Sequence, residues 1–205
     1  MDPHRVSPMY YGFARENEPR TQQWITVEWL VYLAVSQLKF GIVSRGVLID
    51  IPRLRNVPYL EPETPIYPEN LDAWEKMAHI RIEMGDFVFV RTGRWARRAE
   101  KGPWELNRHA AGLHESCARR LKVRDIAMLG SDGVSDVMPS MAPGVIEAIY
   151  QLMLIAMGVN LFDNCDLEAL AAACAQHKRW TFLLTANPLA VPAGTGSPIN
   201  PVAVF

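Results

Sequence analysis

The sequence predicts a single mixed α/β domain, and three observations support this fold class. The chain has 205 residues, of which 49% are hydrophobic and 21% charged, as expected for one compact domain with a buried core. From Gly41 onward, apolar runs typical of strands alternate with segments of helical pattern. Loops rich in proline and glycine separate these segments, and none is long enough to be an interdomain linker.

Six runs rich in Val, Ile, Leu or Phe predict the strands of one sheet. They cover residues 46–51, 86–92, 126–131, 159–163, 180–185 and 201–205.

Four segments after Gly41 have helical patterns, at residues 71–79, 114–122, 143–157 and 167–177. The third places Pro143 in its first turn and ends at Gly158, and the fourth begins behind Asp166, a favourable N-cap. An earlier helix is expected at residues 24–35. It contains Glu28 and is shorter than the ~20 residues needed to cross a bilayer, so we interpret it as a buried or half-buried helix.

Charge and cysteine content exclude several classes of protein. Lys and Arg total 21 against 22 Asp and Glu, and this net charge of −1 gives no field to attract nucleic acid or an anionic membrane. Three cysteines without a CxxC pair indicate reduced thiols, and the N-terminus lacks a signal peptide. We therefore expect a cytoplasmic protein with neither a nucleic-acid nor a membrane partner.

The spacing of the five histidines does not by itself predict a metal site. No HxH, HxxxH or HExxH pattern occurs, so exposed or core histidines are the simpler interpretation. Asp2 and His4 form the only tight pair of a carboxylate and an imidazole, at an end of the chain that would normally fray.

Two carboxylate-bearing segments follow predicted strands, where α/β proteins commonly build their sites. Asp132 and Gly133 lie in the first, together with Asp136, although a simple turn also explains this pair. Asp163 ends the next strand and is free to face a ligand, whereas Asp166 is expected to cap the following helix.

A glycine-containing loop near the C-terminus offers backbone N–H groups from Thr195, Gly196 and Ser197 to an anion or a carbonyl oxygen. A tight turn bounded by prolines explains this loop equally well. A separate basic run between Arg91 and Lys101 is interleaved with tryptophan and flanked by Glu100 and Glu105, which favours a solvated loop or a segment that gates a substrate over a nucleic-acid face.

Six ordered blocks together resemble the cyclase family of metal-dependent hydrolases, which includes the kynurenine formamidases, or arylformamidases. The resemblance is continuous over residues 41–205. The blocks are Gly41–Pro52, Gly85–Gly93, Ala111–His114, Leu129–Gly133, Asp163–Leu167 and Gly194–Val204.

This resemblance implies a swivelling β/β/α domain at residues 41–205, preceded by an atypical segment at residues 1–40. It implies a hydrolase that uses Zn or Mn to open amide-type C–N bonds, with N-formylkynurenine, from tryptophan catabolism, as the best-known substrate class. A small-molecule substrate and a homo-oligomer are the expected partners.

The sequence departs from the family at the metal ligands. The family's N-terminal His-x-Gly-Thr-His-x-Asp-x-x-x-His motif is absent, and Tyr150 stands where relatives often carry a histidine. The resemblance leaves Asp2, His4 and Asp163 as candidate ligands, with His4 as the candidate catalytic residue. Asp163 replaces a longer glutamate.

The resemblance further implies that Asp132, Gly133, Thr195, Gly196 and Ser197 bind the substrate, and that they converge with Asp163 on one cleft. Two functional hypotheses remain. The chain is either a shortened version of a hydrolase, for instance from a wrong start site, or a non-catalytic relative that serves as a binding or oligomerisation module. Loss of the N-terminal motif should also uncover apolar surface, so that residues such as Trp24, Trp29 and Phe40 either refold over the gap or leave an exposed patch that promotes association.

Overall fold

The structure is a computed structural model that describes residues 35–191 and 194–205, together with the backbone of two short strands, β1 (Arg5–Val6) and β2 (Ile25–Thr26). Its contacts divide the chain into two units. One comprises residues 1–42 and 185–202, and the other residues 43–184 and 203–205. Each unit is described by itself.

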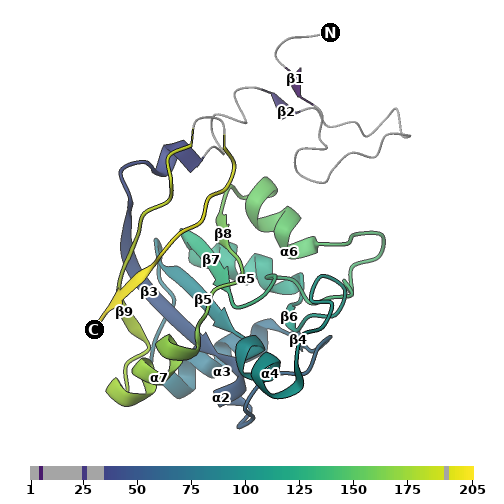
Figure 1. Cartoon of the computed structure of the whole chain (residues 1–205), viewed down its shortest axis with the longest axis vertical. Coiled ribbons are helices and arrows are strands. Elements are labelled where there is room, and N and C mark those ends of the chain that lie inside the picture. The colour runs from purple at the N-terminus through teal and green to yellow at the C-terminus, as the bar shows by residue number, and fades with distance from the viewer. Residues whose placement is uncertain (1–4, 7–24, 27–34, 192–193) are drawn as a thin grey trace. The chain divides into compact units, whose positions relative to one another are not determined.

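A six-stranded sheet confirms the mixed α/β fold, and all six predicted strands are present (Figure 1). The spatial order is β10-β9-β3-β5-β7-β8. Their bounds are β3 Ile42–Asp50, β5 Phe87–Arg91, β7 Met128–Ser131, β8 Asn160–Phe162, β9 Thr181–Ala186 and β10 Val202–Val204. Strands β3, β5, β7 and β8 run parallel, with Val47 opposite Val88 and Val88 opposite Leu129. Two further short strands, β4 (Pro65–Ile66) and β6 (Gly112–Leu113), form a parallel pair.

The four helices predicted after Gly41 are also present, with shifted ends. They are α3 Pro68–Ala78, α5 Ser116–Arg124, α6 Ala148–Tyr150 continuing as a π-helix over Gln151–Ala156, and α7 Glu168–His177. The placement of Pro143 in a first turn is wrong, because α6 begins five residues later, at Ala148. The carboxylate of Asp136 binds the backbone N–H groups of the first turn there. The N-cap of α7 is Leu167 and not the predicted Asp166, although the Asp166 carboxylate accepts a hydrogen bond from the backbone N–H of Glu168 at 3.1 Å.

Two helices were not predicted. Helix α2 (Ile51–Leu54) directly follows β3, and α4 (Arg94–Lys101) occupies the basic run that was interpreted as a loop. No residue of α4 is buried, and Trp95 is its only large apolar residue, so its sequence lacks the run of large apolar side chains that marks a helix packed on a core.

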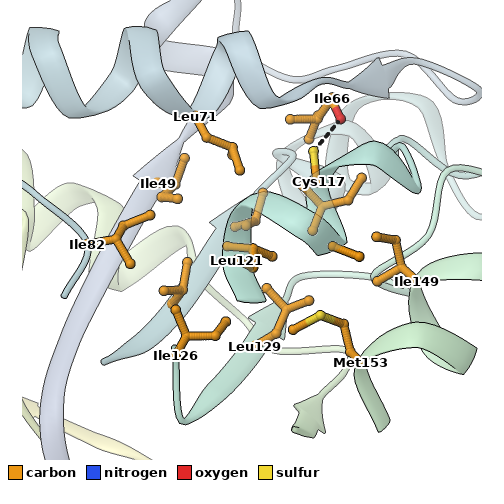
Figure 2. Close-up of a cluster of buried hydrophobic side chains, with 14 of the residues drawn as sticks. Ile49, Ile66, Leu71, Ile82, Cys117, Leu121, Ile126, Leu129, Ile149 and Met153 are labelled. Carbon is orange, nitrogen blue, oxygen red and sulfur yellow. Dashed lines mark hydrogen bonds between the residues drawn. The ribbon is translucent and has the colours of Figure 1, made fainter. Parts of the chain in front are cut away.

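The main core lies between one face of the sheet and helices α3, α5 and α6 (Figure 2). Strand residues Val47, Ile49 and Leu129 pack there against Leu71 of α3 and Leu121 of α5, and all five are fully buried. Helix α7 contributes none of its buried residues to this cluster, and it lies on the other side of the strands (Figure 1).

Aromatic rings pack across the second face of the sheet, where two glycines make room for them. A Cβ atom on Gly46 would lie 2.2 Å from the Phe182 ring, and one on Gly130 would lie 2.5 Å from the Phe89 ring. Phe89 contacts Phe162 edge to face, with ring centroids 6.1 Å apart. The two glycines therefore fix how closely the aromatic layer approaches the strands.

The other unit contains the antiparallel strand pair β1–β2 and ends of the sheet strands β3 and β9. A short 3₁₀ helix covers Val35–Leu38, and the backbone N–H of Val35 donates to the carbonyl of Gly194 at 2.8 Å. Phe40 is 91% exposed, whereas Trp24 and Trp29 lie outside the described residues.

The helix expected at residues 24–35 is contradicted at its start, because Ile25–Thr26 form strand β2, paired antiparallel with β1. The rest of that prediction falls outside the described residues. Among the residues that the structure describes, no helix is both long and apolar enough to span a membrane.

The glycine at position 130 provides a test of the aromatic face. We expect Gly130→Ala to lower the free energy of unfolding by about 1–3 kcal/mol, because the added methyl group collides with the buried Phe89 ring. Gly196→Ala is the matched control, since nothing lies within 4 Å of its added Cβ. Equal stability of the two variants in urea unfolding would contradict this packing.

Candidate active site

The parallel strands β5, β7 and β8 end at the same edge of the sheet, and polar residues follow each of them directly. Thr92 follows β5, Asp132 follows β7 and Asp163 follows β8. Adjacent parallel strands bring their following loops together, so these residues share one edge. Backbone hydrogen bonds of 2.8 Å from Asn164 to Gly133 and 2.9 Å from Cys165 to Ser131 join the last two loops.

The carboxylate of Asp132 is fully buried and binds the backbone at the start of α4. It accepts hydrogen bonds from the N–H groups of Thr92, Gly93 and Arg94 at 2.8–3.1 Å and from the Thr92 hydroxyl at 2.7 Å. Burial raises the pKa of Asp132, an effect that these donors oppose. In this arrangement Asp132 holds the loop after β5 and supplies the N-terminal cap of α4 from another strand.

A second buried carboxylate, that of Asp136, holds the start of α6. Its two oxygens accept from the backbone N–H groups of Ile149 at 2.6 Å and Tyr150 at 3.0 Å. Burial raises the pKa of Asp136 to about 6. This bond explains why the helix begins late: its N-terminal donors are satisfied by a carboxylate twelve positions before Ala148 in the sequence.

Asp163 differs from both because its side chain remains accessible to solvent. Its one hydrogen bond within the described residues comes from the hydroxyl of the buried Ser135, at 3.1 Å. Although solvent reaches it, protein atoms surround the carboxyl closely, and this partial desolvation raises its pKa to about 6. The negative charge of Glu147 adds to the increase. Asp163 is therefore the carboxylate at this edge that is placed to meet a ligand.

Further negative charge and a phenol surround Asp163. The charge of Asp163 contributes to the raised pKa of Asp136, and it also raises the pKa of the half-buried Tyr150. No cationic side chain pairs with Asp163 among the described residues. An unpaired carboxylate in such surroundings is stabilised by a proton or by a bound cation.

One cation, Arg94, lies on the same pair of loops. Its Nη1 donates to the backbone oxygen of Asp132 at 3.1 Å and to the side-chain oxygen of Asn164. Its guanidinium also stacks on Trp95, 4.3 Å from the ring centroid, and the indole N–H of Trp95 donates to the carbonyl of Cys165 at 2.8 Å. Helix α4 is thus tied to the loops after both β7 and β8.

The ends of β3 and β5 carry a separate ion-pair network. Arg91 donates to the buried Asp50 at 2.8 Å and makes a two-pronged contact with Glu168 at 2.7 and 3.1 Å. Asp50 also accepts from the backbone N–H of Arg53 at the start of α2. These carboxylates are neutralised, so the network joins α2, β5 and α7 and leaves no open ligand position.

The three thiols are poor nucleophiles. Cys117 and Cys174 are buried, and Cys165 is half-buried. Burial raises the pKa of each thiol to about 12, so the reactive thiolate is scarce at neutral pH.

The structure brings together only part of the predicted site. Asp132 and Asp163 follow neighbouring strands, and Gly133 lies between them without a positive φ angle. Asp2 and His4 lie outside the described residues. Thr195, Gly196 and Ser197 belong to the other unit, where the Ser197 hydroxyl bridges the N–H of Leu189 and the carbonyl of Pro198, both at 3.0 Å.

Sequence reasoning did not assign roles to Ser135, Glu147 or Asn164. Ser135 lies in the same short segment as Asp132, and Asn164 directly follows Asp163, so proximity to a strand end was the available signal. Glu147 is 16 positions from Asp163 in the sequence, and only the fold brings their charges within interaction range.

The described residues do not by themselves provide a metal centre. None of their groups of His, Cys, Asp and Glu side chains contains three members able to hold one ion. Both oxygens of Asp136 are used by the backbone of α6, so among the described residues the open carboxylates near this edge are those of Asp163 and the exposed Glu147. A catalytic Zn usually requires three protein ligands, so Zn or Mn does not fit this part of the chain alone.

Comparison with known protein families identifies the chain. The family model Cyclase, described as "Putative cyclase", matches residues 23–136, more than half of the sequence. The chain therefore belongs to the cyclase family. A search of curated proteins found no match.

Solved structures agree with this assignment. The protein in a crystal structure described as a novel cyclase shares 26% sequence identity with this chain, and the two structures superpose with a TM-score of 0.70. The match covers 84% of this chain and 56% of that one. Isatin hydrolase A from Ralstonia solanacearum is 23% identical with a TM-score of 0.62, over 80% of this chain and 60% of that one. A structure described as a potential metal-dependent hydrolase with cyclase activity is 16% identical with a TM-score of 0.56, over 97% and 75% of the two chains.

Because the last two structures are less than 25% identical to this chain, they show only that it shares the fold of cyclase-family hydrolases. The chain spans less than two thirds of the length of the first two of these structures.

The raised pKa of Asp163 predicts a pH dependence of stability. Its folded pKa of about 6 exceeds the ordinary value of about 3.9, so protonation favours the folded chain. This contribution is complete below pH ~4 and is lost as the pH rises through about 6. We expect Asp163→Asn to raise the free energy of unfolding at pH 7, because it removes a charge that the folded state disfavours. Since solvent reaches the group and screens this charge, the expected increase is only about 1 kcal/mol.

Urea unfolding between pH 4 and 8 checks this expectation. Asp166→Asn is the control, since Asp166 is an exposed carboxylate three positions away. An Asp163→Asn variant whose stability falls with pH as steeply as that of the unsubstituted chain would contradict the raised pKa.

Proposed function

We propose that the chain is a hydrolase of amide-type C–N bonds on aromatic amines, in the manner of the arylformamidases. Membership of the cyclase family supports this class of reaction. One observation carries the proposal: the accessible carboxylate of Asp163, with its pKa raised to about 6, stands at the edge of the sheet without a cationic partner among the described residues. A group of this kind readily takes up a cation or a proton near neutral pH.

The proposed substrates are small aromatic amides that are either open or cyclic. An open formamide such as N-formylkynurenine fits the arylformamidase resemblance, and the structural likeness to an isatin hydrolase suggests a cyclic amide as the second form. Both contain a carbonyl bonded to the nitrogen of an aromatic amine. In either case water adds to the carbonyl carbon, the C–N bond breaks, and the nitrogen leaves with a proton.

Asp163 has a ligand-binding role in this proposal. Ser135 orients one oxygen of Asp163 by donating a hydrogen bond, which leaves the second oxygen for a ligand. We assign Asp163 as the ligand that this chain would offer to Zn or Mn, together with Asp2 and His4, and His4 as the group that moves the proton. Gly133, Thr195, Gly196 and Ser197 remain the proposed substrate-binding residues. The fully buried carboxylate of Asp132 would contribute indirectly, by holding the loop after β5.

For the 205 residues as written, we expect negligible metal binding and negligible turnover of N-formylkynurenine or isatin. The family motif that supplies most ligands is absent from the sequence, and the phenol of Tyr150, whose pKa lies above its ordinary value of 10.0, is a poor substitute for imidazole. Metal analysis of the purified chain, combined with both hydrolysis assays, measures this directly.

A gain-of-function variant sharpens the test. Tyr150→His places an imidazole beside Asp163 and should increase Zn uptake, whereas Tyr150→Phe should not. Stoichiometric Zn or Mn in the unsubstituted chain, with turnover abolished by a chelator and by Asp163→Ala, would overturn the expectation of inactivity. Failure of Tyr150→His to take up Zn would favour the non-catalytic binding or oligomerisation module instead.

A further inference from the structure

We propose that Arg94 and Asn164 recognise a carboxylate group on the ligand of this site. The proposal rests on the proposed function and deepens it, because it restricts the substrate class to aromatic amides that also carry an anionic group. It concerns binding alone, so it can be tested whether or not the chain turns over a substrate.

The guanidinium of Arg94 is partly buried but has only neutral oxygens as hydrogen-bond partners. Within the described residues, its Nη1 binds the Asp132 backbone oxygen and the Asn164 amide oxygen, and its Nε and Nη2 donate to nothing. The carboxylate of Asp132 does not pair with it, because that carboxylate is occupied by the backbone of residues 92–94 and the Thr92 hydroxyl. Arg94 therefore retains donors for a further anion.

Desolvation makes such an anion favourable. Burial and the positive charge of Arg98 lower the pKa of Arg94, and the nearby negative charge of Asp132 opposes this effect without fully offsetting it. A guanidinium binds a carboxylate through two parallel N–H groups, which is the geometry that Nε and Nη2 provide.

The arrangement around Arg94 is held rigidly. The guanidinium stacks on Trp95, whose indole N–H is fixed to the Cys165 carbonyl. Asn164 adopts a positive φ of 61°, a conformation that asparagine tolerates better than most residues, and its backbone N–H is bound to Gly133. Because Arg94 occupies the amide oxygen of Asn164, the amide NH₂ of this exposed residue faces away from that contact as a second donor.

The charges at this edge fit a ligand with two different ends. Asp163, Asp136 and Glu147 make one end acidic, and they would repel an anionic ligand unless a cation held it nearby. Arg94 is fixed to Asn164, the residue next to Asp163. A small molecule that directs an amide at Asp163 and a carboxylate at Arg94 would match both the acidic and the cationic part of this edge.

Anthranilate and anthranilamide provide matched probes, because both are aromatic amines of similar shape and only the first carries a carboxylate. We expect anthranilate to bind the unsubstituted chain at least tenfold more tightly than anthranilamide in calorimetric titration at pH 7.5. Arg94→Met should weaken anthranilate binding about tenfold or more and leave anthranilamide within about twofold, as expected for loss of a hydrogen bond to a charged group.

Two variants separate recognition from structural support. Arg94→Lys keeps the charge and should retain part of the preference for anthranilate, whereas Arg98→Met, on the same helix and over the same Trp95 ring, should change it little. If Arg94 only fastens the loops together, Arg94→Met will weaken both probes equally, and the proposal fails. It fails as well if the unsubstituted chain does not bind anthranilate at concentrations up to about 10 mM.

The two proposals fail in different ways. Binding of anthranilate that depends on Arg94, without any amide hydrolysis by metal-loaded Tyr150→His, would support the carboxylate site and count against the hydrolase. Amide hydrolysis with no preference for anionic substrates would support the hydrolase and count against the carboxylate site.

Discussion

The arrangement of the candidate site depends on buried carboxylates that bind backbone N–H groups of distant segments. Asp132 joins the end of β7 to the start of α4, and Asp136 joins the following loop to the start of α6. Each satisfies donors that a helix N-terminus leaves without partners. Because both carboxylates are committed in this way, Asp163 is left as the accessible acid at this edge, with Ser135 as its hydrogen-bond donor.

The strands could be predicted from sequence, whereas the helix starts could not. Runs such as Phe87–Arg91 are apolar and buried along their whole length, so a short window identifies them. The start of α6 is set by Asp136 and that of α4 by Asp132, and neither contact leaves a local signal. The arginine-rich sequence of α4 favours a loop for a different reason, because Trp95 is its only large apolar residue.

The candidate site was predictable only in outline. Asp163 could be singled out because it ends a strand and lies in a block that resembles the cyclase family. The raised pKa of its carboxyl arises from desolvation and from Glu147, which the fold brings near. The tie between Arg94 and Asn164 crosses 70 positions of sequence, and such pairs become visible only once the strand order is known.

Asp163 is a solvent-accessible carboxylate held in a desolvating, acidic environment. Carboxyl-carbon NMR titration measures this most directly, with Asp163→Asn used to assign the resonance. The structure predicts that the Asp163 resonance titrates with an apparent pKa near 6, in a titration coupled to that of Asp136. An apparent pKa at the ordinary aspartate value of about 3.9 would contradict the account.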